Sequence, residues 1–330
     1  MKAGAKACRT SGDPAAPYFT FRRFMMETYG APLYRVPVDF GFGCPHRGSD
    51  GAGGCTFCDA EGGRSVIIAG AGSLAEQVRH GVGFARRRYG ARRFLAYVQA
   101  HTGTFADPDR LRERLDELSG LMAFDAVSLG TRPDCLSDEA LDVLVDLRRR
   151  LDVWVELGVQ TVHDGTLQRI NRGHDWAAAR GAIVRATARG LRVAAHMIIG
   201  LPGEGAEHFA ATADALAALP VFAVKVHNLH VIAGTRLAEQ YVREPFPVLD
   251  ERGYAEALIE VLRRLPSRVA IMRINTDTPG DRLMAPRWKM TKGEFREFVI
   301  AEMRRCGARQ GDRCQSSVIS DQCKGLVLVS

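Results

Sequence analysis

The sequence predicts an α/β fold in which parallel strands alternate with crossover helices. Seven short runs rich in β-branched apolar residues are separated by longer stretches with helical periodicity. Alternation of this kind is typical of a parallel sheet. The strands are nearly continuous apolar runs, as expected when both faces of a sheet are covered. Two closures fit this pattern, an open doubly wound sheet and a barrel, and both place the chemistry at the carboxyl ends of the strands.

The expected elements follow one another without a linker rich in Pro, Gly or Ser. Asp107 before Pro108 is typical of a helix start, and so is Ser137 before two acidic residues. We expect strands at 34–41, 93–99, 126–129, 153–160, 192–199, 223–229 and 270–275, and helices at 73–89, 108–121, 138–149, 176–189, 206–217 and 250–264. The predicted organisation is a flexible lead over 1–21, a catalytic core over 22–266, and a strand-and-helix appendage with a Cys-containing tail over 267–330.

The composition is that of an ordinary globular protein. Hydrophobic residues make up 46% and charged residues 25%, which excludes a disordered chain, a collagen and a coiled coil. No apolar run of membrane-spanning length and no secretory signal is visible, so we expect a cytoplasmic protein without a membrane partner. The net charge of +7 is explained either by arginine-rich composition or by an anionic partner such as RNA. No arginine run is interleaved with aromatic residues, so we favour arginine-rich composition over an RNA partner as the explanation of the charge.

Three of the eight cysteines lie in a glycine-rich loop after the first expected strand. Cys44, Cys55 and Cys58 have the spacing C-x10-C-x2-C. Three close thiolates repel one another unless a cation, normally a metal, offsets their charge. A closed zinc or iron–sulfur site takes four ligands, so three cysteines leave one position open, as in a catalytic metal site. The structural alternative is a Cys3His zinc site completed by His46.

The cysteine loop is the first of a series of motifs at 36–47, 130–136, 156–161, 170–174, 198–204, 227–231 and 275–277. Over about residues 20–312, this series resembles the radical S-adenosylmethionine (SAM) superfamily. Within it, the series is similar to the uncharacterised bacterial YhcC-like family, which is related to the Elongator radical SAM subunit. The resemblance implies a partial (βα)6 TIM-like barrel of the radical SAM type with a short C-terminal extension.

The resemblance also implies two cofactors and a reaction type. Cys44, Cys55 and Cys58 would hold three irons of a [4Fe–4S] cluster, and the fourth iron would bind SAM. An electron from a donor such as flavodoxin or ferredoxin would cleave SAM to a 5′-deoxyadenosyl radical that abstracts hydrogen from the substrate. The Elongator relation favours RNA modification, whereas the absence of a visible RNA-binding module leaves small-molecule chemistry open. The alternative function is a non-catalytic zinc or iron–sulfur nucleic-acid-binding protein.

Two polar residues match SAM-contacting positions in radical SAM coproporphyrinogen dehydrogenases. Gln160 would bond the ribose hydroxyls and Arg172 would grip the methionine carboxylate, because a guanidinium binds a carboxylate through two donors. The segment Gly200, Leu201 and Pro202 matches the stretch that packs against adenine.

Other positions depart from the family pattern. Thr102 lies in a segment that replaces the usual glycine-rich stretch beside the SAM amine. Gly130 stands where the Elongator subunit has Glu, so a carboxylate contact to SAM would have to come from Glu156.

Four histidines and three tail cysteines complete the candidate residues. We expect the histidines near the barrel mouth, where they would serve proton transfer or hydrogen bonding to the substrate, although each also fits an ordinary structural role. The tail cysteines would hold a second cluster or have no function. The histidines are His101, His196, His227 and His230, and the tail cysteines are Cys306, Cys314 and Cys323.

Overall fold

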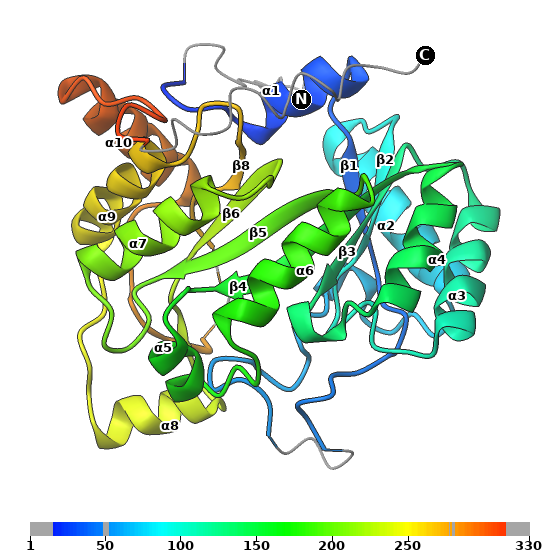
Figure 1. Ribbon diagram of the computed structural model, residues 1–330, viewed down its shortest axis with the longest axis horizontal. Coiled ribbons are helices and arrows are strands. Elements are labelled where there is room, and N and C mark those ends of the chain that lie inside the picture. The colour runs from blue at the N-terminus through cyan, green and yellow to red at the C-terminus, as the bar shows by residue number, and fades with distance from the viewer. Residues whose placement is uncertain (1–15, 49–52, 277, 279–280, 315–330) are drawn as a thin grey trace, which may run out of the picture.

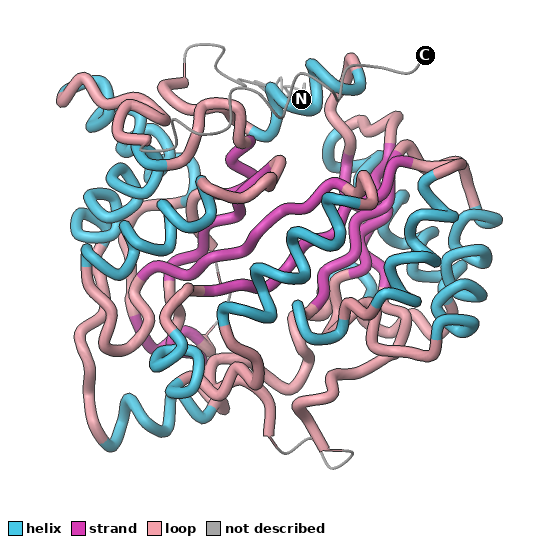
Figure 2. Tube along the Cα trace, viewed as in Figure 1, coloured by secondary structure: helices cyan, strands magenta, loops and turns pink. Residues whose placement is uncertain are grey.

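The computed structural model describes residues 16–48, 53–276, 278 and 281–314. Seven parallel strands form one curled sheet in the order β1-β2-β3-β4-β5-β6-β8. Helices cover the outer face of this sheet (Figures 1 and 2). A doubly wound sheet reverses its strand order at a switch point, whereas this order follows the chain throughout. The sheet is therefore a half-barrel, which confirms the partial TIM-like barrel that the family resemblance implied and excludes the open doubly wound sheet.

The strands of this sheet are β1 Tyr34–Val38, β2 Phe94–Val98, β3 Ala126–Thr131, β4 Asp152–Gln160, β5 Arg192–Ile199, β6 Ala223–Asn228 and β8 Ala270–Arg273. Two short strands, β7 Val231–Ile232 and β9 Leu283–Ala285, pair antiparallel beside it. The α-helices are α1 Phe21–Tyr29, α2 Leu74–Tyr89, α3 Pro108–Leu121, α4 Asp138–Arg148, α5 Asp164–Arg169, α6 Trp176–Ala188, α7 Ala206–Ala217, α8 Arg236–Arg243, α9 Glu251–Arg264 and α10 Lys292–Arg305. Short 3₁₀ turns occur at η1 Val66–Ile68 and η2 Pro133–Cys135.

All seven expected strands and all six expected helices are present, with ends shifted by a few residues. The two expected helix starts are confirmed, because Asp107 accepts a hydrogen bond from Asp109 N and Ser137 accepts one from Ala140 N. The helices α1, α5 and α8 and the β7–β9 pair were not predicted. Each is too short to give a clear periodic signal.

The first strand explains how a proline fits into a parallel sheet. Pro37 lies within β1, which is an edge strand and pairs only with β2. A proline lacks the N–H that a central strand needs, and an edge strand has one side without a partner.

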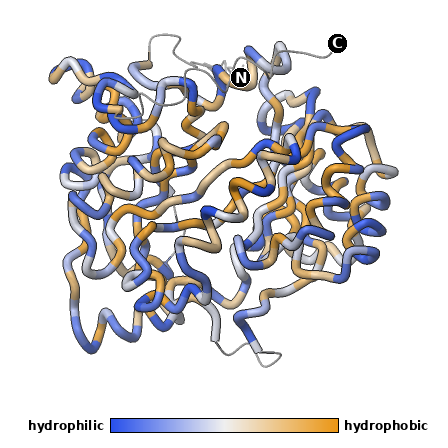
Figure 3. Tube along the Cα trace, in the orientation of Figure 1, coloured by the Kyte–Doolittle hydropathy of each residue, from blue (hydrophilic) through white to orange (hydrophobic). Residues whose placement is uncertain are grey.

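The amino-terminal end of the half-barrel is closed by α1. Its Phe24 ring packs against Trp154 and Phe222, with ring centroids 6.0 and 5.1 Å apart. Trp154 is fully buried and shares an apolar layer with Leu95 and with small residues of the other strands, Ala126, Ala194, Ala223 and Ala270. Figure 1 shows α1 at one end of the sheet and the blue loop that follows β1 at the other, and Figure 3 shows the apolar strands between them. The polar chemistry is thus confined to the carboxyl end.

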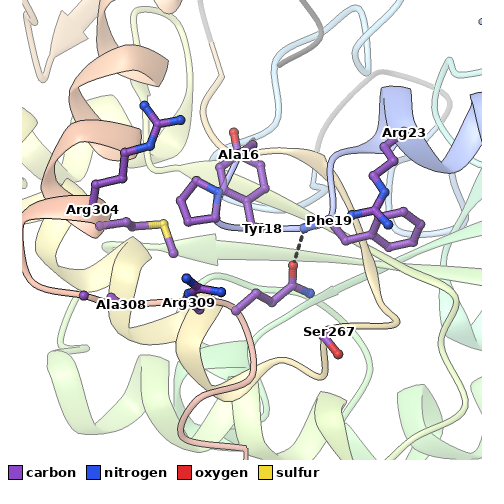
Figure 4. Close-up of a pocket in the computed structure, with 12 residues that line it drawn as sticks. Ala16, Tyr18, Phe19, Arg23, Ser267, Arg304, Ala308 and Arg309 are labelled. Atoms are coloured by element: carbon purple, nitrogen blue, oxygen red, sulfur yellow. Dashed lines mark hydrogen bonds between the residues drawn. The ribbon is translucent and has the colours of Figure 1, made fainter. Parts of the chain in front are cut away.

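Residues 16–21, which belong to the expected flexible lead, pack onto the carboxyl-terminal part of the chain. Tyr18 is buried, and Phe19 N donates a 2.7 Å hydrogen bond to Gln310 Oε1 (Figure 4). Ile271 N donates to Phe19 O at 2.8 Å, so the lead pairs with the outer edge of β8. The strand expected in the appendage is this β8, and it is the seventh strand of the core sheet.

The packing of α1 over the amino-terminal end of the half-barrel, which we call the α1 plug, gives a stability prediction. We expect Phe24→Ala to lower the free energy of unfolding by about 3–4 kcal/mol, because it leaves a cavity against Trp154 and Phe222. Urea unfolding of the cluster-free chain measures this loss. Phe105→Ala, at a ring that is 42% exposed, is the control and should cost less than about 1 kcal/mol. Equal losses in the two variants would show that α1 does not close the barrel.

Candidate active site

The carboxyl ends of the strands surround a cavity of about 210 Å³ that contains all three loop cysteines. Ten of the residues singled out in the sequence line it: Cys44, Cys55, Cys58, His101, Thr102, Gly130, Glu156, Gln160, Arg172 and His196. A neighbouring cavity of about 200 Å³ shares Gln160 and His196 and is also lined by His227 and His230. Gly200, Leu201 and Pro202 line neither cavity. We call the first the cysteine cavity and the second the histidine cavity.

The cysteine loop presents three free thiols to one space. The pKa of the Cys58 thiol is raised to about 11, first by burial and then by the neighbouring Cys55 sulfur. Three thiolates therefore cannot persist here without added positive charge. Three arginines line the same cavity and supply part of this positive charge: Arg47, Arg132 and Arg172. This donor set fits an anionic metal cluster held by three thiolates.

The zinc alternative gains no support from the side-chain positions. His46 does not line the cysteine cavity and lies against Gly173, where an added Cβ would be 2.7 Å from the His46 ring. Among the described residues, no three His, Cys, Asp or Glu side chains are grouped to hold a metal ion. One zinc draws its ligands tightly together, whereas the thiols of a cubane cluster bind separate irons and lie farther apart.

Arg172 is buried beside the cysteines and is not a surface arginine. Its Nη1 lies 3.3 Å from Cys55 Sγ, and its Nε and Nη2 donate to Gly158 O at 3.2 and 2.7 Å. Gly158 is required in β4 for this approach, because a Cβ there would lie 2.5 Å from Arg172 Nη2 and 2.8 Å from Gln160 Nε2. The chain thus places a guanidinium and an amide side by side at the end of β4.

The backbone around the cysteine cavity is strained. In the described part of the chain, the non-glycine residues with positive φ are His101, Gln160 and Asn171, with φ of 51°, 73° and 51°. His101 and Gln160 line the cavity, and Asn171 Nδ2 donates to Gly54 O in the cysteine loop at 2.8 Å. Such conformations cost energy and collect at functional sites. Thr102 adds a buried hydroxyl without a hydrogen-bond partner, as a site made for a ligand would contain.

The floor of the cysteine cavity is a hydrogen-bond network centred on Glu156, which is fully buried on β4. Its carboxylate accepts hydrogen bonds from the side chains of four other strands: Tyr97 Oη at 3.1 Å, Ser128 Oγ at 2.8 Å, His196 Nε2 at 2.7 Å and Lys225 Nζ at 2.8 Å. Arg35 Nη2 on β1 lies 3.8 Å away. Since both carboxylate oxygens already have partners, Glu156 is committed to the protein interior.

Burial and charge shift the pKa values of this network. Despite its burial, Glu156 keeps a pKa well below its usual value, because Lys225 and His196 stabilise the carboxylate. Burial lowers the pKa of Lys225 to about 7 and that of His196 to about 4, and in His196 the nearby Lys225 adds to the effect. His196 is therefore neutral at pH 7 and donates its Nε2 hydrogen to Glu156.

The histidine cavity contains a second neutral imidazole. Burial, followed by the neighbouring His196, holds the pKa of His227 well below its usual value. His227 Nδ1 bonds Thr276 Oγ1 at 2.6 Å, whereas its buried Nε2 has no hydrogen-bond partner. His230 bonds Asn228 and Thr278 at 2.6 and 2.7 Å. The wall of the cavity therefore contains one buried imidazole nitrogen that lacks a partner.

The sequence analysis missed Arg35, Tyr97 and Lys225. Lys225 was detectable in principle, because a lysine in the middle of an apolar strand is almost never buried without a partner. Of the tail cysteines, Cys306 is exposed and Cys314 half-buried, and Cys323 lies outside the described residues. No helix of the described residues has the length and apolar character needed to cross a bilayer.

The low pKa of His196 gives a prediction for stability in acid. The unfolded chain protonates this residue below about pH 6.5 but the folded chain only near pH 4, so the free energy of unfolding falls over that interval as pH falls. We expect His196→Gln, which keeps an N–H for Glu156, to remove on the order of 2–3 kcal/mol of this fall. Urea unfolding at pH 7 and pH 4 measures it, with the exposed His80→Gln as control. A fall as large in His196→Gln as in the wild type would contradict the prediction.

Comparison with known proteins agrees with this geometry. Residues 38–216 match the model of the Radical SAM superfamily, and residues 221–305 match that of the Radical_SAM C-terminal domain. The chain is 34% identical to the uncharacterised protein YtqA of Bacillus subtilis over 295 residues, covering 89% of this chain and 92% of the relative. It is 36% identical to protein YhcC of Escherichia coli over 266 residues, covering 80% and 85%.

A solved structure of Methanocaldococcus infernus Elp3 shares the fold, with a TM-score of 0.64 at 20% identity over 86% of this chain and 64% of that one. The extent of the family match makes the chain an enzyme and sets aside the non-catalytic nucleic-acid-binding alternative. The chain belongs to the radical SAM superfamily and resembles its YhcC-like members.

Proposed function

We propose that this enzyme holds a [4Fe–4S] cluster on Cys44, Cys55 and Cys58, binds SAM beside it, and acts on a substrate in the histidine cavity. The observation that carries the proposal is the meeting of three free thiols, Arg172 and Gln160 in one cavity that adjoins a second, polar one. When bound, the cluster and SAM supply a reductive cleavage that yields a 5′-deoxyadenosyl radical for hydrogen abstraction. The electron would come from a small redox protein such as flavodoxin or ferredoxin.

Arg172 and Gln160 are the residues proposed to bind SAM. Arg172 uses two of its donor groups on Gly158 O, which fixes the guanidinium plane, and its Nη1 faces Cys55. A buried guanidinium fixed in this way offers its remaining N–H groups to a carboxylate without further loss of side-chain freedom. Gln160 lines both cavities, so its amide can bond a ligand at the junction between them.

His227 and His196 are the residues proposed to contact the substrate. Both are neutral at pH 7 and line the histidine cavity, and the buried Nε2 of His227 has no hydrogen-bond partner within the described residues. The histidine cavity has a volume of about 200 Å³, so an RNA substrate would enter it only as a single extruded nucleotide.

Anaerobic reconstitution tests the proposal. We expect about four irons and four sulfides per chain, and slow formation of 5′-deoxyadenosine from SAM after reduction. Cys55→Ala should abolish this cleavage, because the cluster would lose a ligand. Cys306→Ala, at the exposed thiol that directly follows α10, is the matched control and should retain it. Undiminished cleavage in Cys55→Ala would show that the loop does not hold the catalytic cluster, and a count near eight irons that falls in Cys306→Ala would assign a second cluster to the tail.

Arg172 gives a separate prediction for SAM affinity. Truncating a buried charged partner costs on the order of 2–4 kcal/mol, so Arg172→Ala should weaken SAM binding by at least tenfold. Arg172→Lys should restore only part of the affinity, because an ammonium cannot reproduce the planar fork. SAM titrations are normalised to iron content, since Arg172 also contacts Cys55. Arg180→Ala, on the exposed face of α6, is the control. Equal affinity in wild type and Arg172→Ala would remove Arg172 from the SAM site.

A further inference from the structure

The interior of the half-barrel contains more positive charge than its single carboxylate balances. Lys225 is paired with Glu156 at 2.8 Å, but Arg35 approaches Glu156 only to 3.8 Å. The Arg35 Nε and Nη2 atoms are inaccessible and have no hydrogen-bond partner. Arg273 on β8 forms no hydrogen bond or ion pair with any other described residue. Burial and the nearby Arg35 lower the pKa of Arg273, which shows that the two guanidinium groups repel each other.

Aromatic rings stabilise one of these charges only in part. The Arg35 guanidinium lies 5.1 Å from the Tyr97 ring centroid and 5.6 Å from that of Phe21. Ring faces attract a cation but leave most of its N–H donors without an acceptor. An anion bound to Arg273 would reduce the repulsion between the two guanidinium groups.

A cavity of about 390 Å³ opens beside these residues, where β8 meets the segment that leads into α1. We call it the side cavity. Four cationic residues line it, Arg22, Arg273, Lys292 and Arg296, and none of the described residues that line it is acidic. Arg296 pairs with Glu297 at 2.8 Å, and Lys292 also interacts with other residues. Arg22 and Arg273 are the cations without a hydrogen-bonded partner among the described residues.

The side cavity lies close to the proposed site of chemistry. Asn275 lines the side cavity, and the next residue, Thr276, lines the histidine cavity and bonds His227. Phe21 lines the side cavity and contacts Arg35, which in turn stacks on Tyr97 of the cysteine cavity. The side cavity and the histidine cavity are therefore lined by consecutive residues of the chain, Asn275 and Thr276.

We propose that the side cavity binds the phosphate or carboxylate group of a small-molecule substrate, with Arg273 and Arg22 as its principal donors. A guanidinium fork matches both anions through two parallel hydrogen bonds. Asn275 contributes an amide donor at the side that faces the histidine cavity. The term substrate rests on the proposed function, whereas the anion site itself rests on the charges and contacts given above.

The test measures binding of inorganic phosphate and of acetate to the reconstituted full-length chain, by calorimetric titration at constant ionic strength against chloride. We expect the wild type to bind at least one of the two, and the stronger probe identifies the anion class. Arg273→Gln should weaken that binding by about tenfold or more, as expected when a buried charged donor is removed. Arg79→Gln is matched in charge and lies on the exposed surface of α2, where it should change binding less than about twofold.

Several outcomes would overturn the proposal. The first is that neither probe binds more strongly than chloride. The second is that wild type and Arg273→Gln bind the probes equally. The third is that neither small probe binds, whereas a short oligoribonucleotide binds and requires Arg273. If Arg273→Gln does not fold, Arg22→Gln at the edge of the side cavity replaces it and should weaken binding by about threefold or more. Formation of 5′-deoxyadenosine by the same wild-type preparation is measured in parallel. Cleavage without anion binding overturns only the anion site, and anion binding without cleavage overturns only the cofactor proposal.

Discussion

The buried carboxylate of Glu156 is the interaction on which the half-barrel interior depends. Side chains from five other strands converge on it, and four of them donate hydrogen bonds. A buried charge is tolerated only when its partners are present in good geometry, because its desolvation penalty is large. The network therefore favours one relative placement of the strands. It also forms the floor of the cysteine cavity. The contacts that hold the strands together therefore also form the bottom of the site.

The interior is arranged in layers along the barrel axis. The first layer is apolar, with Trp154 among alanines and under the α1 plug. The second contains Glu156 and its partners, and above it small residues such as Gly130 and Gly158 leave room for larger groups. Side chains two positions apart on a strand share one face, so Trp154, Glu156 and Gly158 of β4 belong to successive layers. The chemistry is thus held at one end of a rigid scaffold whose other end serves stability.

The hydrogen bonds that Glu156 accepts within the protein affect how this enzyme would recognise SAM. The family resemblance implied that a carboxylate contact to SAM would have to come from Glu156, but this carboxylate already accepts four hydrogen bonds within the protein, including those from His196 and Lys225. Recognition is then proposed to rely on Arg172, Gln160 and backbone groups. The positive φ of Gln160 and the close fit of Gly158 to Arg172 agree with a backbone shaped around these two side chains.

The sequence by itself determined the local features of the protein. Helix starts at Asp107 and Ser137, the apolar strands and the cysteine spacing all depend on residues close together in the chain, and their physical signals are periodicity and residue chemistry. The family resemblance already implied the barrel, which is confirmed, whereas the α1 plug and the hydrogen bond between Lys225 and Tyr97, 128 positions apart, were decided only by the tertiary structure. These features depend on the order and curvature of the strands, which bring side chains that are distant in the sequence together inside the half-barrel. For the same reason Gly200, Leu201 and Pro202, which match a family motif, lie outside both cavities, whereas Arg35 and Arg273, which match none, face the charged interior.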